Sequence, residues 1–484
     1  MKIKKRVNLF ITLIIAANLL LRLPALWEPT SYGDECIYLA LGQALRKGLV
    51  FYRDIHDNKP PLLYLIAGLA GGKLFYFRIV SVLWNTLNIW LIALLTSKLT
   101  KKPWAPVLTA GLFLIFSLLP EGWVANGELF MIMPATLGVY LALIAQEKKS
   151  AWPWFASGFC FSLAFLFKIP VAFDFAGFFF ALLIFKFKGI KSLLQLSKQK
   201  WPYLLLAGFV LPIALSIVYY AQKGAFTPYV RSALMQNIGY LSSWNGGGNN
   251  GLYQRAFILV LVTALIYRWR QQLGFSFVII SLTLGFSLYG VFLSERPYPH
   301  YLIEAAPWAA LTLGLLLTQI NTKKLIITTL LTFLILAGVN KFNFWWYPIM
   351  PYYRNFIDFA LLGKISQQQY FRYFGQASLD DYQLAKELKS ITRPDEPVFI
   401  WGDSACAYAL SERIPVGRYT VAYHIKDFDA FNATLQALEK HQPTYIIKLN
   451  DEHTEFPQLD AFLASHYVFS QQLNRALVYH RISP

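Results

Sequence analysis

Residues 33–61 combine four carboxylates, one histidine and four basic side chains directly after an apolar run long enough to cross a membrane. Asp34 and Glu35 begin a predicted amphipathic helix at the level of the lipid headgroups. A carboxylate pair at that place can remove the proton of an acceptor hydroxyl or hold a divalent cation. It can equally do no more than stabilise the start of a helix through the helix dipole. The pair alone leaves both interpretations open.

The same stretch ends in YRDIHDNKPP. Arg53 and Lys59 lie where the phosphate of a membrane-embedded lipid would emerge, and such cations bind phosphate. Asp54 and Asp57 add negative charge, so a weak divalent-cation site formed by Asp34, Asp54 and Asp57 is an alternative use of these carboxylates. A solvated loop whose cations reach to the membrane surface would have the same composition.

Polar residues at three more distant places are candidates as well. Lys168 separates two apolar runs, where a lysine is costly unless it is solvated or paired; this makes it a functional candidate, although a lysine reaching to water fits too. Arg296 and His300, in the turn ERPYPHYL, either donate to a phosphate or form an ordinary polar turn. Glu128 opens another run, where a first-turn glutamate complements the helix dipole.

The composition indicates what positions these residues. The chain has 484 residues, of which 56% are hydrophobic and only 14% charged, whereas soluble chains are about 25% charged. A multi-spanning membrane protein is therefore predicted. The net charge of +18 is high enough for a nucleic-acid partner, but such a partner requires a basic patch on a soluble face. Here the basic residues lie between apolar runs, which excludes nucleic acid and indicates membrane orientation instead.

Eleven apolar runs approach the roughly 20 residues that a membrane-spanning helix needs. They are 7–27, 74–97, 104–120, 128–146, 152–168, 169–186, 202–220, 252–267, 272–293, 300–319 and 324–343. The stretch PPLLYLIAGLAGG, 60–72, is too short to cross and is predicted to be a helix on the membrane surface. The first run contains Arg22 and has no small-x-small cleavage site, so it is expected to remain as an uncleaved span.

Charge orients these spans. With the N-terminal MKIKKR inside and eleven alternating spans, the basic clusters between spans all fall inside, as the positive-inside rule requires. Residues 28–72, the loop 221–251, the turn ERPYPHYL and everything after about 345 then face outside. Counting 60–72 as a span would reverse this arrangement. Within the second of these outer segments, SSWNGGGNNG (242–251) is either a mobile lid or a flexible connector.

The C-terminal part has a different pattern. We place the boundary between a membrane domain, 1–345, and an extracytoplasmic α/β domain, 346–484. Its predicted helices are SLDDYQLAKELKSI, SACAYALSER and FDAFNATLQALEKHQ, and its predicted strands are PVFIWGD, TYIIKL, YVFSQQL and ALVYHRI. WGDSAC invites a nucleophile interpretation, but GxSxG is absent, and a strand-to-helix turn with Asp403 or Ser404 as N-cap is preferred.

The three cysteines, Cys36, Cys160 and Cys406, lie far apart in the sequence and have no metal-ligand spacing. Cys36 lies beside the acidic pair, where a lone cysteine usually serves as a small apolar residue. We assign it no role.

The order of these features resembles the GT-C superfamily of membrane glycosyltransferases. An acidic pair follows the first span, K-P-P precedes a short helix, a lysine lies between spans five and six, and R-x-x-x-H-Y follows span nine. More narrowly, the chain is similar to the bacterial branch of glycosyltransferase family 39, the protein mannosyltransferase and aminoarabinose-transferase-like enzymes. The resemblance covers about 1–343, and WGDSACAYALSERIPVGRY resembles the extracytoplasmic tail of many members.

The resemblance implies a polyprenyl-phosphate-linked sugar donor, inversion at the anomeric carbon and Asp34 as the general base. The second carboxylate is Glu35, Asp54 or Asp57, because Asn58 stands where close relatives often place a carboxylate. The residues implied in binding the donor phosphate are Arg53, Lys59, Lys168, Arg296, His300 and Tyr301. Members with monophosphate donors are generally metal-independent and pyrophosphate-donor relatives use a divalent cation, so no cofactor other than a divalent cation is expected.

Residues and resemblance together predict an α-helical polytopic membrane protein, with a GT-C-like bundle of about eleven spans, outer juxtamembrane helices and a small C-terminal α/β domain. The expected partners are a polyprenyl-phosphate sugar, the lipids of the cell membrane (plasma or inner) and a glycan, lipid or protein acceptor. A lipid-linked glycan ligase or polymerase is the first alternative. A transporter or flippase for lipid-linked sugars is the second, but it would place charge near the bilayer midplane, and the charges here cluster at the outer edge.

Overall fold

In the computed structural model the described residues are 2–187, 197–236 and 250–482. The chain divides into two compact units, and each is described by itself. The first unit consists of Met1–Leu23, Ser81–Tyr219 and Leu234–Pro348, and the second of Pro24–Val80, Tyr220–Ala233 and Ile349–Pro484. The predicted lid or connector SSWNGGGNNG lies outside the described residues except for its last two.

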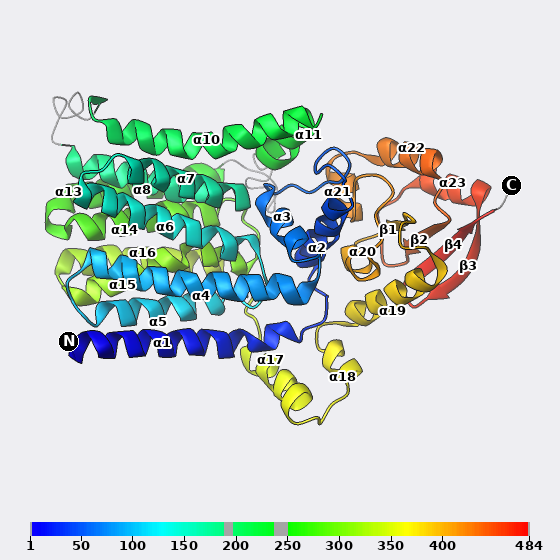
Figure 1. The fold of residues 1–484 in the computed structure, drawn as a ribbon, viewed down its shortest axis with the longest axis horizontal. Coiled ribbons are helices and arrows are strands. Elements are labelled where there is room, and N and C mark those ends of the chain that lie inside the picture. Colours follow the sequence, from blue (N-terminus) through cyan, green and yellow to red (C-terminus); the bar gives the residue numbers. More distant parts are fainter. Residues whose placement is uncertain (1, 188–196, 237–249, 483–484) are drawn as a thin grey trace. The chain divides into compact units, whose positions relative to one another are not determined.

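Long apolar helices make up most of the first unit (Figure 1). In the described part of the chain, seven helices are long and apolar enough to cross a membrane, and four apolar helices are shorter. The seven are α1 (Lys2–Arg22, followed by η1, Leu23–Leu26), α4 (Leu74–Leu99), α6 (Gly127–Lys148), α10 (Lys200–Gln222), α13 (Asn250–Leu273), α15 (Leu302–Thr318) and α16 (Thr322–Lys341). The shorter four are α5 (Ala105–Leu118), α7 (Trp152–Phe167), α8 (Val171–Lys186) and α14 (Phe275–Val291). Every predicted apolar run coincides with one of these helices, which confirms the polytopic membrane class.

Small residues let the helices of this unit approach closely. α6 packs against α7, α8 against α14, and α15 against both α14 and α5. Where α7 meets α10, a side chain at Gly158 would collide with the backbone of Leu205, and one at Gly208 with the backbone of Phe155. Such reciprocal glycines are a typical device for joining helices in a membrane, where apolar surface alone gives little net attraction between them.

Arg22 interrupts the first predicted span and is buried at the end of α1. Its guanidinium donates to Asn18 Oδ1, one turn earlier, at 2.9 Å. It also donates to the carbonyl and hydroxyl oxygens of Ser117 in α5, each at 3.2 Å. A buried guanidinium is costly unless its N–H groups are bonded, so these contacts explain how an apolar helix carries an arginine.

The second unit begins with α2 (Gly33–Arg46) and α3 (Leu62–Leu69). α3 has eight residues, so 60–72 forms a helix that is too short to cross a membrane, as predicted. The short segment 220–233 contributes α11 (Phe226–Tyr229) and most of η2 (Val230–Met235). After these come α17 (Ile349–Phe356), η4 (Ile357–Leu361) and α18 (Gln367–Arg372).

The predicted α/β fold of the C-terminal part is confirmed. Four strands, β1 (Phe399–Trp401), β2 (Tyr445–Leu449), β3 (Tyr467–Leu473) and β4 (Ala476–Arg481), form a sheet in the order β1-β2-β4-β3. β1 pairs with β2 in parallel, and the other pairs are antiparallel. The helices are α19 (Gln376–Ile391), α20 (Ala405–Ser411), α21 (Ala422–Asp427), α22 (Phe431–His441) and α23 (Pro457–His466). Every strand and helix that the sequence predicts for this part is present, and α17, α18, α21 and α23 are additional.

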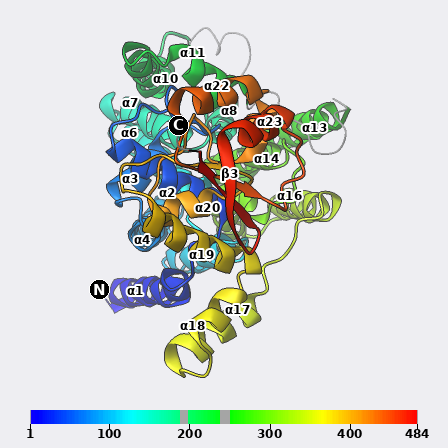
Figure 2. The ribbon, with the colours of Figure 1, turned by 90° about the vertical axis from the view of Figure 1, so that its right-hand side faces the viewer.

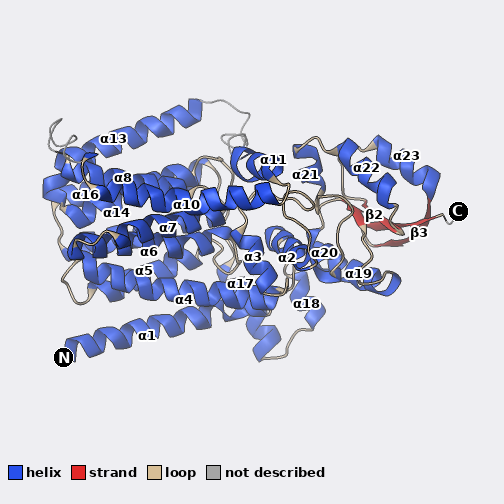
Figure 3. Cartoon of the chain, turned by 45° about the horizontal axis from the view of Figure 1, so that its top comes forward, coloured by secondary structure: helices blue, strands red, loops and turns tan. Residues whose placement is uncertain are grey.

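Helices cover both faces of this sheet. α22 and α23 lie on one face and α19 on the other, with β3 as the outermost strand (Figures 2 and 3). The core between α22, α23 and the sheet includes Trp401 from β1, Ile446 from β2 and Leu459 from α23, all nearly inaccessible to solvent. The parallel β1–β2 pair requires a crossover, and the chain from α20 to α22 supplies it.

A disulfide bond joins Cys36 in α2 to Cys406 in α20. Cys36, for which the sequence indicated no role, therefore has a structural one. α2 packs against α20, which brings the two Cα atoms to 4.7 Å although 370 residues separate the cysteines. No local spacing predicts such a pair. Cys160 is the remaining cysteine and is buried as a free thiol.

Candidate active site

Asp34 lies on the first turn of α2 with 32% of its side chain exposed. The hydroxyl of Tyr38, one helical turn later, donates to Asp34 Oδ2 at 3.1 Å. The ammonium of Lys59 lies 3.4 Å from the same oxygen. The carboxylate is thus fixed in place and still accessible, which is what a general base requires.

Lys59 lies between two carboxylates. Besides the contact with Asp34, its Nζ is 3.8 Å from Oδ2 of Asp57 and 5.1 Å from the centre of the Tyr38 ring. Its backbone is fixed as well, because the hydroxyl of Tyr52 donates to its carbonyl oxygen at 2.7 Å. Only 18% of the side chain is exposed. A cation held in this way is positioned to meet an anion that approaches Asp34.

Asp57 is buried directly behind Lys59. It accepts hydrogen bonds from the hydroxyl of Tyr64, in α3, and from the backbone N–H of Asn58. Burial acts to raise the pKa of Asp57, but the charge of Lys59, the electrostatic interaction with His424 and the bond from Tyr64 together hold this pKa below its usual value. Asp57 is therefore a buried carboxylate that supports Lys59.

Glu35, the neighbour of Asp34, points into different surroundings. Its Oε1 accepts from Nε of Arg78 at 2.9 Å, and its Oε2 accepts from Nη2 of the same guanidinium at 2.5 Å. Arg78 also pairs with Glu28, at 2.7 Å, and Glu28 accepts from the hydroxyl of Tyr352. Both carboxylates and the guanidinium are nearly inaccessible to solvent. Both carboxylate oxygens of Glu35 are thus occupied by a structural ion pair with Arg78. This geometry gives no support to a direct catalytic role for Glu35.

Arg53 is bound by the residue next to it. Its Nε and Nη2 donate to the two carboxylate oxygens of Asp54 at 2.7 and 2.8 Å. The bonds from Arg53 lower the pKa of Asp54.

Among the described residues no three His, Cys, Asp or Glu side chains converge as metal ligands. Instead Lys59 lies within 4 Å of both Asp34 and Asp57, and the predicted divalent-cation site is left as a prediction.

A second polar cluster lies within the first unit. Lys168 follows the last residue of α7 and forms an ion pair with Glu128, on the first turn of α6. Its Nζ also lies 4.4 Å from the centre of the Tyr301 ring. His300 is 2.9 Å from Glu121 through Nδ1 and 4.0 Å from Glu128 through Nε2. Sequence reasoning chose Lys168, His300 and Tyr301 from separate segments, and the structure brings these three together.

Arg296 lies in the turn before this cluster. Its backbone N–H donates to the hydroxyl of Ser294 at 3.5 Å, and its side chain is half-buried. The turn leads into the single turn η3 (Pro299–Tyr301), which carries His300 and Tyr301. Its role in donor binding stays a prediction.

Sequence reasoning missed several residues that hold this machinery. Tyr38 stands four residues after Asp34 on a predicted helix, a spacing that signals contact. Arg78, Glu121 and His424 offered no such signal, since each meets its partner across a long stretch of chain. Tyr64 lies near Asp57 in the sequence, but the two are separated by the turn before α3 and share no helical spacing.

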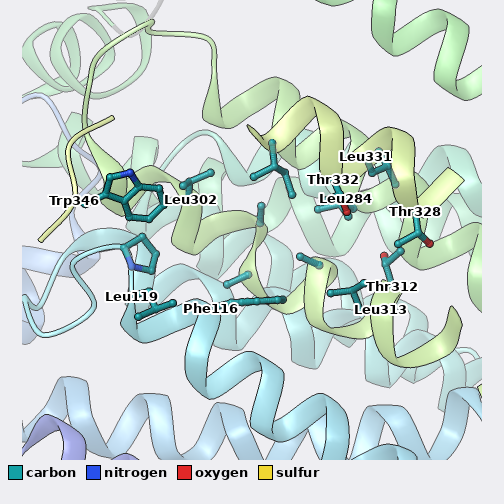
Figure 4. Close-up of a pocket in the computed structure, with 15 residues that line it drawn as sticks. Phe116, Leu119, Leu284, Leu302, Thr312, Leu313, Thr328, Leu331, Thr332 and Trp346 are labelled. Carbon is teal, nitrogen blue, oxygen red and sulfur yellow. The ribbon is translucent and has the colours of Figure 1, made fainter. Parts of the chain in front are cut away.

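An apolar cavity of about 290 Å³ lies among α5, α14, α15 and α16. Figure 4 shows an elongated space, with Trp346, Leu119 and Leu302 toward one end and Thr312 and Thr328 toward the other. Its walls are almost entirely hydrocarbon, which suits an acyl or prenyl chain and not a sugar. Leu302 follows the His300–Tyr301 pair directly in the chain.

Comparison with known proteins adds a family match over part of the chain and a similar fold. Residues 58–220 match the family described as dolichyl-phosphate-mannose-protein mannosyltransferase. No curated protein matches by sequence. ArnT from Cupriavidus metallidurans bound to undecaprenyl phosphate is similar in structure, with a TM-score of 0.61, 12% identity and 98% of each chain covered. The apo form of the same protein gives a TM-score of 0.58, 13% identity and the same coverage.

The near-complete coverage means that the likeness to ArnT includes the helical bundle and the C-terminal α/β part alike. The family match starts at Asn58, immediately before Lys59, and extends past Lys168 into α10. The resemblance inferred from the motifs is thereby supported: the chain has a GT-C, ArnT-like fold, and residues 58–220 match the protein mannosyltransferase family model.

Proposed function

We propose that this chain is an integral-membrane glycosyltransferase that moves a sugar from a polyprenyl-phosphate-linked donor to an extracytoplasmic acceptor, with inversion at the anomeric carbon. The observation that carries the proposal is the accessible carboxylate of Asp34 held 3.4 Å from the ammonium of Lys59. Transfer from a lipid phosphate needs these two groups side by side, one for the acceptor proton and one for the departing charge. The ArnT structure with undecaprenyl phosphate supports this class of donor.

The proposed reaction is a direct displacement. Asp34 accepts the proton of the acceptor hydroxyl, and the acceptor oxygen forms a bond to the anomeric carbon from the face opposite the phosphate. The bond between that carbon and the phosphate oxygen breaks, and the electron pair leaves with the polyprenyl phosphate. Lys59 stabilises the added negative charge of this leaving group, which needs a cation and no proton.

The remaining cations are assigned to the donor phosphate as part of the same proposal. Lys168, with Tyr301 beneath its ammonium and His300 nearby, offers a positively charged donor set on the first unit. Arg296 and Arg53 are assigned supporting roles. Lys168 is paired with Glu128 in the structure. In the proposed complex, Lys168 exchanges this carboxylate for the phosphate of the donor.

The apolar cavity among α5, α14, α15 and α16 is assigned to the prenyl chain of the donor. Its lining is apolar along its length, as a hydrocarbon chain requires. Leu302, at one end of the cavity, follows the turn that carries His300 directly in the sequence. A chain lying there would present its phosphate at that turn.

The disulfide supports an extracytoplasmic second unit. Disulfides persist in oxidising compartments and are rare in the cytosol, and Cys36–Cys406 lies in the part that charge patterning predicts to be outside. We therefore propose that the N-terminus is cytoplasmic, that the C-terminal domain lies outside the cell or inner membrane, and that the acceptor is a glycan, lipid or protein on that side.

A lipid-linked glycan ligase or polymerase is the second candidate. It shares the donor chemistry and differs in accepting a long glycan. The groove between residues 414–419 and α22, with a volume of about 650 Å³ and with polar side chains such as Arg418 and Gln436, is the observation that keeps this candidate open. A transporter or flippase for lipid-linked sugars, the second alternative that the sequence allowed, explains neither Asp34 nor its contact with Lys59.

The test is a donor panel. Purified protein in lipid vesicles is incubated with polyprenyl-phosphate sugars and an acceptor extract, and released polyprenyl phosphate is measured. We expect release with one sugar class, and a fall of about 10²- to 10³-fold for Lys59→Ala, the usual cost of losing one group that stabilises transition-state charge. Lys386→Ala, which changes an exposed lysine of α19, is the matched control.

Two outcomes would contradict the proposal. One is movement of intact lipid-linked sugar across the vesicle membrane without release of polyprenyl phosphate. The other is equal release by wild type and Lys59→Ala. A parallel assay with EDTA tests the divalent cation: we propose a reaction that needs none, and loss of activity that Mg²⁺ or Mn²⁺ restores would replace that part of the account.

A further inference from the structure

His424 lies where the C-terminal domain meets the loop that carries Lys59. Its Nε2 is 3.5 Å from Oδ1 of Asp57, and both side chains are nearly inaccessible to solvent. Asp57 uses its other oxygen toward Lys59 and Tyr64. A buried carboxylate is costly unless it is paired and hydrogen-bonded, so His424 is one of the few groups that make Asp57 tolerable in this place.

The surroundings of His424 lower the pKa of its ring from the usual value of 6.5. Burial is the largest influence on the ring and lowers its pKa, against the charge of Asp57, which raises it. A neutral imidazole has one N–H, and a proton on Nε2 would direct that N–H at Asp57. The other charged and titratable groups that act on the ring are Lys59, Asp427, Asp34 and His56, whose ring centre lies 5.5 Å away.

The fold of the C-terminal domain determines where His424 lies. It is carried by α21, which follows α20 in the crossover between β1 and β2. The backbone N–H of Ala422 donates to the carbonyl oxygen of Gly402 at 3.2 Å. The backbone N–H of Tyr423 donates to Oδ1 of Asp403 at 3.2 Å. The WGD turn after β1, noted in the sequence for its Asp and Ser, thus fixes the helix that presents His424.

Backbone conformation explains why this turn has a glycine. Gly402 has φ +141°, in the region that L side chains rarely adopt, and a side chain there would collide with Leu449 of β2. The neighbouring Ser404 is the N-cap residue of α20, and its hydroxyl donates to Asp381 at 2.7 Å. Asp403 and Ser404 therefore hold α21 and α19, and neither has the surroundings of a nucleophile.

We propose that His424 is a positioning residue for sugar transfer, which holds Asp57 and through it Lys59, so that the C-terminal domain completes the site. The inference rests on the proposed function. A chain of three contacts carries it: His424 to Asp57 at 3.5 Å, Asp57 to Lys59 at 3.8 Å and Lys59 to Asp34 at 3.4 Å. Without His424 the Asp57 carboxylate loses a partner, and Lys59 is no longer held at the distance from Asp34 that the reaction uses.

The test compares four proteins in the vesicle assay: wild type, His424→Leu, His424→Gln and His453→Leu. His453 is an exposed histidine of the same domain and serves as the matched control. We expect His424→Leu to lower kcat/KM for the donor by about 10- to 100-fold, the usual effect of misplacing a catalytic group slightly. His424→Gln keeps an N–H donor of similar reach and should recover most of this loss. His453→Leu should match wild type.

Two readouts separate positioning from a purely structural role. The first is the pH profile: His424→Leu should move its acidic limb to higher pH, because Asp57 has lost a partner that lowers its pKa. The second is coupling: Asp57→Asn combined with His424→Leu should be no slower than Asp57→Asn alone, since both changes break the same contact. A structural defect would lower the yield of folded protein in both His424 variants and leave the pH profile in place.

The failures are distinguishable. If wild type releases no polyprenyl phosphate from any donor, the proposed function is overturned and the inference with it. If wild type is active and His424→Leu matches it in rate and pH profile, or if the effects of Asp57→Asn and His424→Leu simply multiply, the inference alone is overturned.

Discussion

The ammonium of Lys59 lies 3.4 Å from the carboxylate of Asp34, on the first turn of α2. These two residues come from different ends of the segment that the sequence singles out, and the packing of α2 against α3 brings them together. A base for the acceptor and a cation for the leaving phosphate thereby occupy one accessible site.

The two adjacent carboxylates should differ in what they do. Glu35→Gln should destabilise the protein by about 3 to 5 kcal/mol, because it leaves the buried guanidinium of Arg78 short of charge. Asp34→Asn should leave stability unchanged, since Asp34 is partly exposed. Thermal unfolding in detergent measures both. A stable but inactive Glu35→Gln would contradict the structural role of Glu35 and return it to the catalytic candidates.

The Cys36–Cys406 disulfide should make transfer sensitive to reduction. It anchors α2, which carries Asp34, to α20 of the C-terminal domain. We expect reductant to lower the unfolding temperature and the activity of wild type. The double variant Cys36→Ser/Cys406→Ser should be equally impaired with and without reductant. Cys160→Ser is the control, because Cys160 is a free buried thiol. Wild type that keeps its full activity and stability after complete reduction would refute this prediction.

Filling the apolar cavity should discriminate between donors by chain length. Ala309 lines the cavity on α15. Ala309→Trp should raise KM for a long-chain polyprenyl donor and leave a donor with one or two isoprene units unaffected, because only the long chain needs the space. The short donor thus serves as the control within the same variant. An equal change for both donors would place the prenyl chain elsewhere.

Acid should destabilise the second unit partly through His56. Burial is the main cause that lowers the pKa of His56 from 6.5 to about 3. In the unfolded chain this histidine binds a proton near pH 6.5, whereas in the folded protein it resists until about pH 3, so lowering the pH across that window favours unfolding. His56→Gln should show a weaker loss of stability between these pH values. Unfolding temperatures measured from pH 7 to pH 4 provide the check, and parallel curves for variant and wild type would count against it.

The sequence predicts the helices, the strands and the class of protein well because each depends on local pattern. Apolar runs of sufficient length mark α1, α4 or α16 without reference to any other part of the chain, and a short run of aromatic and β-branched residues marks β2. The motif residues Asp34 and Lys59 lie 25 positions apart in one segment, so topology alone suggested their proximity.

What the sequence does not predict are partners that meet through packing. Arg78 reads as a single charge near the start of an apolar run, and nothing there signals that it neutralises Glu35 and Glu28. His424 and Cys406 reach the site only because the crossover after β1 folds back over the outer loop of the second unit. Burial and pairing of these groups are properties of the folded chain, which is why the two carboxylates looked equivalent in the sequence.

The role of Asp34 as general base is tested most directly by the release of polyprenyl phosphate. The rate is measured for Asp34→Asn and wild type in lipid vesicles, with the active donor and equal amounts of folded protein. Loss of a general base costs about 10²- to 10⁴-fold in rate, so we predict a loss of that size with normal membrane abundance. Release at the rate of wild type would contradict the assignment of Asp34 and with it the proposed mechanism.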